Sequence, residues 1–369
     1  MARKLFVSYF LLLFCLLGVA QVKENKFTMR KLPAKYAVKR QSVSSLSKVK
    51  YVDLKEFLPK GYVTNGTKDY TELIQSVLNK HRNVRFPNFP LLINEKGLTV
   101  QSNSNLYFEN SGSLLMKPNA VERYEMLRLH NVSNIKLINP TLIGDRKKHT
   151  GTKGEWGMGI SIRGDASNIV VYNANITDCW GDGIYIGHLR QITPKNIKIF
   201  NATIDRAYRN GISMTCGDNV EIANTAITNS NFNGIKLEPS NNAAVFKKIV
   251  LRNITTFNSF GWGIAAGGLS KLIGMPGGRK FELEIINHVD DSSKTGVYFG
   301  MISVREKSKN PINGYIKIVN PTWVNNRTMG FEKRKFYQNA PDVEFQNLNN
   351  SLKKSIQKTY AKDREIRYF

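Results

Sequence analysis

A two-part pattern repeats seven times along the middle of the chain and constrains the fold more than any other feature. In its first part an aliphatic residue is followed four positions later by asparagine, at Asn139, Asn173, Asn201, Asn224, Asn253, Asn287 and Asn320. In its second part a glycine precedes an apolar residue, at Gly159, Gly183, Gly211, Gly234, Gly263, Gly296 and Gly330. The glycine follows the asparagine by nine or ten residues in six of the seven units, and the first unit holds about ten more. A repeat of about 30 residues indicates a solenoid.

Each unit contains short segments in which apolar and polar residues alternate, such as Ile169–Tyr172 and Ile184–Ile186. Alternation with β-branched residues predicts strands. A strand of three or four residues cannot bury a face alone, so each strand must pair with its equivalent in the next unit, which describes a parallel β-helix. The repeated asparagine then occupies a tight turn, where it tolerates a left-handed backbone. Stacked rungs about 4.8 Å apart bring these amides within reach of one another as a ladder.

The chain ends have a different pattern from the repeat. Residues 1–20 carry Arg3 and Lys4, an apolar run and small residues before Gln21, which predicts a secretory signal peptide and a secreted or periplasmic protein. Residues 21–50 are basic and lack periodicity, so we expect a tether before a β-helix domain over 51–345. Open solenoid ends need caps. Residues 69–81 have one apolar helical face, and apolar residues spaced by four within 346–369 predict a closing helix before a basic tail.

Charge and composition narrow the chemical classes of molecule that this chain can bind. The formal net charge is +26, and about half of the excess lies in the basic segments at the two ends. For an exported chain this favours an anionic polysaccharide as partner and argues against nucleic acid. We expect no integral membrane segment, because no apolar run reaches the roughly 18 residues that a span needs. After signal cleavage Cys179 and Cys216 remain, which permit but do not imply one disulfide.

The run from Tyr51 through Asp69, Leu73, Ile74 and Gln75 to Val84-Arg85-Phe86-Pro87, followed by the coils, resembles the pectate-lyase-like superfamily. The resemblance covers roughly residues 51–340. It implies an all-β, single-stranded right-handed parallel β-helix with an asparagine ladder, an N-terminal capping helix and a C-terminal helix. It also implies a protein that acts on polysaccharides, as do polygalacturonase-type hydrolases, pectate and alginate lyases, mannuronan epimerases and phage tailspikes. The fold by itself assigns no catalyst.

The strand after each repeat glycine is expected to carry the carbohydrate. Its outward positions are polar, basic and partly aromatic, and the long loop over residues 144–157 leads directly into it. Aromatic rings can stack on sugars and cationic side chains can bind acidic groups. The candidate substrate-binding residues are Trp156, Trp180, Arg163, Tyr185, His188 and Tyr298. The alternative is a solvated sheet face with the tryptophans packed under loops.

Carboxylates on this face could catalyse hydrolysis. Asp182, before Gly183-Ile184, is similar to the first catalytic-motif aspartate of polygalacturonase-type hydrolases, but Arg209-Asn210 and Asn233-Gly234 replace the later Asp-Asp and His-Gly motifs. That family's pair of acids is therefore not carried over. Glu155 should lie about 5 Å from Asp182 and Glu238 about 10 Å, near the retaining and inverting separations respectively. Alternatively, Glu155 and Asp182 only fix turns.

A lyase would use other groups on the same face. Arg209, Lys236 and Arg163 could neutralise a uronate carboxylate, while His149, His188 and Tyr185 are candidates for proton transfer. We expect no cofactor, with a calcium ion held by Glu155, Asp182 and Asp178 as the alternative. The sequence therefore predicts a carbohydrate-active protein, either a hydrolase or a lyase. A polysaccharide-binding, surface or spike protein without turnover is the third possibility.

Overall fold

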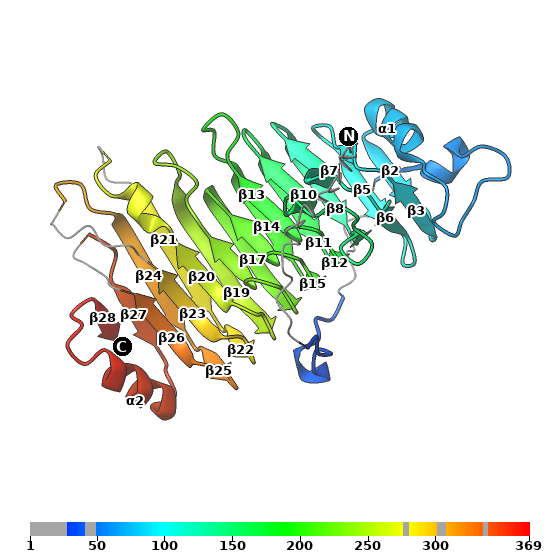
Figure 1. The fold of residues 1–369 in the computed structure, drawn as a ribbon. Coiled ribbons are helices and arrows are strands. Elements are labelled where there is room, and N and C mark those ends of the chain that lie inside the picture. Colours follow the sequence, from blue (N-terminus) through cyan, green and yellow to red (C-terminus); the bar gives the residue numbers. More distant parts are fainter. Residues whose placement is uncertain (1–27, 41–48, 276–279, 301–307, 335–338) are drawn as a thin grey trace, which may run out of the picture.

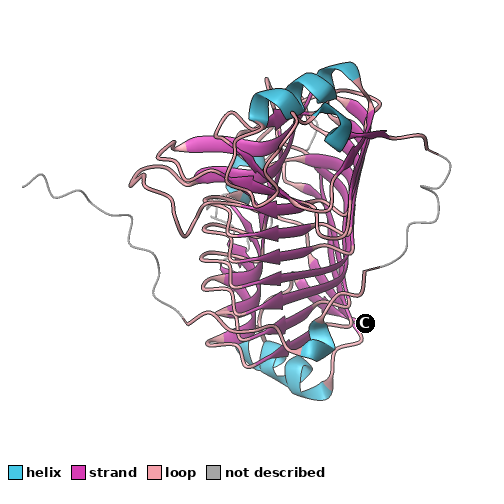
Figure 2. Cartoon of the chain, turned by 90° about the vertical axis from the view of Figure 1, so that its right-hand side faces the viewer, coloured by secondary structure: helices cyan, strands magenta, loops and turns pink. Residues whose placement is uncertain are grey.

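A computed structural model describes the chain apart from residues 1–27, 41–48, 276–279, 301–307 and 335–338. Its strands stack as successive rungs, with a helix at each end of the stack (Figures 1 and 2). All strand pairs within the two described sheets are parallel. The predicted parallel β-helix is confirmed. The predicted signal peptide lies outside the described residues. Among the described residues no helix is both long and apolar enough to cross a membrane.

The nine-stranded sheet, here called sheet B, contains the strands that follow the repeat glycines. Its strands are β4 (Leu98–Thr99), β7 (Arg123–His130), β10 (Trp156–Arg163), β13 (Ile184–Gly187), β16 (Ile212–Met214), β18 (Ile235–Leu237), β20 (Trp262–Gly267), β23 (Thr295–Gly300) and β26 (Met329–Arg334). The register pairs Ile160 with Ile184, Ile184 with Ile212 and Ile212 with Ile235. These side chains are fully buried, which confirms the expected inward row. Each contributes about 2 kcal/mol of hydrophobic stabilisation.

The nineteen-stranded sheet, here called sheet A, forms the other walls of the β-helix. Before the repeat it contains β1 (Val52–Asp53), β2 (Asn83–Phe86), β3 (Pro90–Ile93), β5 (Asn105–Phe108) and β6 (Ser113–Met116). Within the repeat it contains β8 (Ser133–Ile138), β9 (Thr141–Ile143), β11 (Ser167–Tyr172), β12 (Asn175–Thr177), β14 (Lys195–Phe200), β15 (Thr203–Asp205), β17 (Gly217–Thr228), β19 (Phe246–Phe257), β21 (Lys280–Ile286), β22 (Val289–Asp291), β24 (Asn313–Val319) and β25 (Thr322–Val324). Strands β27 (Val343–Gln346) and β28 (Ile366–Tyr368) finish it.

The repeated asparagines form the expected ladder at a turn within sheet A. All seven have φ between 50° and 55°, a region in which asparagine is less strained than most residues. The side-chain amide of Asn173 donates to Asn139 at 2.9 Å, and that of Asn287 donates to Asn253 at 2.8 Å. The ladder is interrupted at Asn201, whose buried Nδ2 has no hydrogen-bond partner among the described residues. These bonds fix the register from rung to rung.

Helices cap both ends of the core as predicted. Helix α1 (Thr71–Lys80) buries Ile74, Val77 and Leu78, and Asp69 accepts a hydrogen bond from the Thr71 amide at 2.9 Å. Helix α2 (Asn350–Thr359) buries Ile356. Its N-terminus is capped by Asn349, which accepts from the Leu352 amide at 2.8 Å. Three short 3₁₀ helices complete the described elements: η1 (Ala34–Tyr36), η3 (Leu54–Phe57) and η4 (Leu269–Leu272).

Two parts of the sequence interpretation gain detail from the structure. Both Cys179 and Cys216 are buried and free, so the permitted disulfide is not formed. Residues 28–40, within the segment expected to be a tether, lie against sheet A, where Tyr36 donates a hydrogen bond to Asp291 at 3.2 Å. This part of the basic segment is therefore in contact with the β-helix.

Candidate active site on the outer face of sheet B

The outward side chains of sheet B form a row that runs along the β-helix axis. The strand register places one residue of each rung in this row: Thr99, Arg128, Ser161, Tyr185, Ser213, Lys236, Ala265, Tyr298 and Glu332. The neighbouring inward positions in these strands are apolar except for the buried Lys333 of β26, so the alternation of the sequence sends the row outward. The row carries the polar and aromatic groups expected on this face.

Glu155, Asp182 and Arg209 meet at the edge of this row. Arg209 Nε lies 3.5 Å from Glu155 Oε1 and 4.0 Å from Asp182 Oδ1. Burial raises the pKa of Glu155, Arg209 lowers it, and the nearby charge of Asp182 raises it again. The structure thus brings together the two carboxylates that the rung spacing placed at adjacent corners. A carboxyl with a raised pKa is suited to donate a proton.

Asp182 differs from the expectation in being inaccessible. Its side chain is 0% exposed, and Oδ1 accepts hydrogen bonds from the Asn210 amide at 3.0 Å and from Asn210 Nδ2 at 3.2 Å. Burial raises its pKa, while Arg209, Asn210 and Ser213 act in the opposite direction. In this conformation Asp182 touches neighbouring protein groups and cannot contact a substrate. Its geometry suits positioning of Arg209 and of the turn at Asn210.

Lys236 lies in the outward row beside an aromatic pair. Burial lowers the pKa of Lys236, Glu238 raises it and Arg209 lowers it. Its Nζ lies 5.9 Å from the centre of the Trp262 ring, which stacks on Tyr298 with centroids 4.1 Å apart. Glu238 and Arg209 therefore both lie near Lys236. The predicted substrate-binding residue Tyr298 is buried, with its ring stacked on Trp262, which corrects the expectation that it is open to a sugar. The sequence interpretation missed Trp262, although it precedes a repeat glycine.

A second charged cluster lies at the N-terminal end of the row and was missed. Glu125 Oε2 contacts Arg128 Nε at 2.8 Å, and Glu125 Oε1 lies 3.3 Å from His130 Nε2 and 3.7 Å from Arg163 NH1. Ser161 donates to Glu125 at 2.9 Å. Despite burial, these hydrogen bonds and charges lower the pKa of Glu125 to about 2. Alternating Leu127 and Leu129 mark β7 as a rung before the asparagine repeat begins, which is the signal that could have found it.

The structure corrects the expected roles of Trp180 and His149. Trp180 is stacked between His149, at 4.1 Å, and Tyr208, at 4.3 Å, so both faces of its ring are covered by protein. His149 is buried, with Nδ1 2.9 Å from Asp145 Oδ2. Neither side chain is open to a sugar. Trp180 and Tyr208 occupy equivalent turn positions of neighbouring rungs, whereas His149 comes from the long loop over residues 144–157.

The remaining predicted residues are partly exposed. The Arg123 guanidinium lies 5.2 Å from the centre of the Trp156 ring, and that of Arg163 lies 5.3 Å from the centre of the Tyr185 ring. His188 contacts Ser240 at 2.9 Å, and burial together with Arg163 lowers its pKa. Trp156, Arg163, Tyr185 and His188 are thus positioned on or beside the sheet B face. Among the described residues no group of three or more His, Cys, Asp or Glu side chains is arranged to hold a metal ion.

Comparison with known proteins agrees with this architecture. A family model described as a right-handed beta helix region matches residues 81–247. The chain is a right-handed parallel β-helix protein. The β-helix is similar to the pneumococcal surface adhesin PfbA, with a TM-score of 0.60 and 13% identity over 80% of this chain and 78% of that one. It is also similar to a Family 28 exopolygalacturonase of Yersinia enterocolitica, with a TM-score of 0.57 and 12% identity over 82% and 72%.

Other β-helices of similar structure include a mannuronan C-5 epimerase module, an iota-carrageenase and a bacteriophage tailspike. At such low identity these structures establish the fold alone. The uncharacterized protein YclG of Bacillus subtilis is 30% identical over 168 residues, which cover 42% of this chain and 27% of YclG. This β-helix chain spans about a quarter of the length of the curated relatives it matches.

Proposed function

We propose that this β-helix protein cleaves glycosidic bonds in an anionic polysaccharide bound along the outer face of sheet B. The observation that supports this most directly is the arrangement of Glu155 beside Arg209. Glu155 is partly exposed and has a raised pKa, and Arg209 is a cation within 3.5 Å of it. A proton donor next to a fixed cation suits a bond whose neighbouring sugar carries an acidic group.

The charges of the row support an anionic substrate. Four cations lie on or beside this face: Arg128, Arg163, Arg209 and Lys236. The three arginines form ion pairs with Glu125, Glu155 and the buried Asp182. Cations outnumber the carboxylates that face solvent, so the surface attracts negative charge. The polysaccharide-acting proteins among the similar structures are consistent with a carbohydrate partner.

In the proposed reaction Glu155 gives its proton to the leaving glycosidic oxygen as the bond breaks. In hydrolysis, water adds its oxygen to the anomeric carbon and releases a proton to solvent. In elimination, a neutral amine takes the C5 proton of a uronate and a C4–C5 double bond forms. The lowered pKa of Lys236 makes its neutral form more accessible for that role. The first route leaves a saturated product and the second an unsaturated uronate that absorbs ultraviolet light.

The test compares Glu155→Gln with Glu221→Gln on a panel of acidic and neutral polysaccharides. Glu221 is a matched control, because it lies in sheet A, is 35% exposed against 32% for Glu155, and also faces an arginine, Arg252, at 4.0 Å. We expect Glu155→Gln to lower kcat by at least about a hundredfold, the usual contribution of a general acid, and Glu221→Gln to leave it unchanged. Reducing ends and ultraviolet absorbance, followed together, separate hydrolysis from elimination. Full activity of Glu155→Gln would refute the assignment.

Binding without turnover is the second candidate, and the burial of Asp182 favours it. With its carboxylate inaccessible, the face offers Glu155 and Glu238 but no exposed close pair of acids at the Arg209 corner. This candidate predicts that no polysaccharide in the panel is cleaved, while an acidic one still retards the chain on affinity electrophoresis. Arg163→Gln should then weaken the retardation, since Arg163 is a partly exposed cation of the row.

A further inference from the structure

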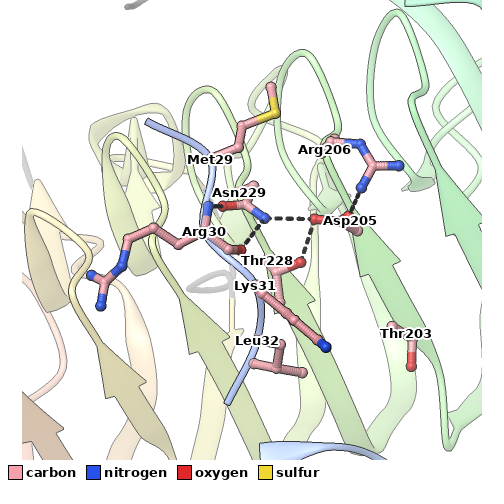
Figure 3. A pocket seen from close by; sticks show the side chains of 9 residues that line it. All are labelled: Met29, Arg30, Lys31, Leu32, Thr203, Asp205, Arg206, Thr228 and Asn229. Atoms are coloured by element: carbon pink, nitrogen blue, oxygen red, sulfur yellow. Dashed lines mark hydrogen bonds and ion pairs between the residues drawn. The ribbon is translucent and has the colours of Figure 1, made fainter. Parts of the chain in front are cut away.

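Residues 28–36 lie along sheet A in a groove that is here defined by Asp205, Asn229, Phe257, Asn258 and Asp291. These groove residues lie at or just beyond the ends of β15, β17, β19 and β22. Figure 3 shows Met29 to Leu32 beside the ends of β15 and β17. A cavity of about 390 Å³ lies between Met29–Leu32 and the ends of β15 and β17. The segment contacts residues that lie about 200 to 260 positions later in the sequence. The docked segment is therefore recognised by the folded β-helix, since local sequence cannot supply these partners.

Recognition begins with the backbone of the segment. The Arg30 amide donates to Asn229 Oδ1 at 3.0 Å, and Asn229 Nδ2 donates to the Arg30 carbonyl at 3.0 Å. One side-chain amide thus pairs with both polar groups of a single residue, as a neighbouring strand would. Asn258 Nδ2 donates to the Thr28 carbonyl at 3.0 Å, two residues earlier. These hydrogen bonds bind the main chain of an extended segment, whatever side chains the segment carries.

The β-helix itself also holds the side chains of Asn229 and Asn258 in place. Both occupy turns with positive φ, 51° for Asn229 and 53° for Asn258. Asn258 Nδ2 donates to Asn229 Oδ1 at 2.8 Å, and Asn229 Nδ2 donates to Asp205 Oδ1 at 2.8 Å. The docked segment supplies the remaining partners of these amides. Such preorganisation reduces the entropy that binding costs.

Side chains of the segment meet complementary groups in the groove. Arg30 NH1 donates to Ser292 Oγ at 2.8 Å, and its guanidinium lies 5.0 Å from the centre of the Phe257 ring. Tyr36 donates to Asp291 at 3.2 Å. The acidic group that faces the basic segment is Asp291, whose pKa the charge of Arg30 helps to lower, whereas Asp205 is paired with Arg206. Charge complementarity therefore favours a cationic occupant.

We propose that this groove is a binding site for an extended basic peptide, with the chain's own residues 28–36 as its ligand. The specificity comes from the Asn229 and Asn258 backbone contacts, from an arginine over Phe257, and from a tyrosine hydroxyl on Asp291 six residues later. In this structure the segment of the same chain fills the site. Its covalent attachment gives it a high effective concentration, so it competes with any free peptide.

The test measures binding of a fluorescent peptide of residues 28–40 to two full-length proteins, the wild type and Arg30→Pro. The proline removes both the amide that donates to Asn229 and the guanidinium, so the chain's own segment is weakened and the groove is left intact. We expect Arg30→Pro to bind the peptide at least about tenfold more tightly than the wild type. Equal affinity of the two proteins would overturn the proposal, as would equal binding of a scrambled peptide of the same composition.

A second pair of variants tests the groove itself in the Arg30→Pro background. Asn229→Gly keeps a residue that tolerates positive φ but removes the amide, and should weaken peptide binding about tenfold. Asn196→Gly is the control, since Asn196 has φ 56° and its side-chain amide bonds Asn168 and Asn219, away from the groove. An equal loss in both variants would refute recognition by Asn229. The peptide assay requires no polysaccharide, so its result is independent of the proposed cleavage.

Discussion

Replacing Arg209 by glutamine should shift the pKa of Glu155 upward by about one unit. Arg209 Nε lies 3.5 Å from Glu155 Oε1, with side chains 21% and 32% exposed respectively. Two unit charges at that distance interact by about 1 kcal/mol if water fully screens them, and by several times more in a lower dielectric. Because both side chains are partly exposed, we take the interaction energy to be near the lower of these values, about 1 kcal/mol, which corresponds to about one pKa unit.

The sign follows from the charge that is removed. Arg209 favours the ionised form of Glu155 and so lowers its pKa; glutamine restores the higher value that burial imposes. If protonated Glu155 is the acid, activity falls as pH rises through that pKa. The alkaline limb of kcat at saturating polysaccharide should therefore move about one unit upward in Arg209→Gln, whatever the loss in kcat/KM.

Two measurements check this reasoning together. The pH profile of kcat is recorded for the wild type, for Arg209→Gln and for the control Arg252→Gln, whose partner Glu221 lies in sheet A. In parallel, the Glu155 carboxyl is titrated by carbon NMR without substrate. An upward shift in both experiments supports the assignment. A limb that stays in place while the NMR pKa rises would show that Glu155 is not the proton donor.

Three further outcomes follow from other contacts. Burial raises the pKa of Asp290 to about 7. Its protonated form therefore stabilises the fold fully below the ordinary pKa of 3.8, and this stabilisation is lost as pH rises toward 7. The melting temperature of Asp290→Asn should depend less on pH over that range than that of the wild type. Lys333 is buried in ion pairs with Asp363 and Glu365, so Lys333→Met should lower the free energy of unfolding by about 3 kcal/mol, measured by denaturant titration. Arg163→Gln should weaken binding of an acidic polysaccharide roughly fivefold at low salt and less at high salt, as titration calorimetry would register.

Much of the fold could be predicted because its determinants are local and repeated. A positive φ at Asn173 or Asn287 follows from residue type, and the spacing to the next glycine sets each turn and strand. Helix α1 was visible as one apolar face near Asp69. Every rung repeats the same short-range rule, so the rung-to-rung pairing follows without long-range information.

The candidate site was harder to predict, because exposure depends on neighbours in other rungs. Asp182 is covered by Arg209 and Asn210, which lie 27 and 28 positions later in the sequence. Trp180 cannot stack on a sugar, because its ring lies between the rings of His149 and Tyr208. Outward direction in a strand pattern therefore did not guarantee an accessible side chain.

The sequence by itself determined the stacked architecture, its caps and the basic, aromatic character of one sheet face. Only the tertiary structure decided that Glu155 and Asp182 share Arg209, that Glu125 gathers two arginines and a histidine, and that residues 28–36 dock on sheet A. The physical reason is the range of the interactions. Backbone turns and alternation act over a few residues, whereas burial, ion pairing and groove recognition depend on groups that come together only once the coils are stacked.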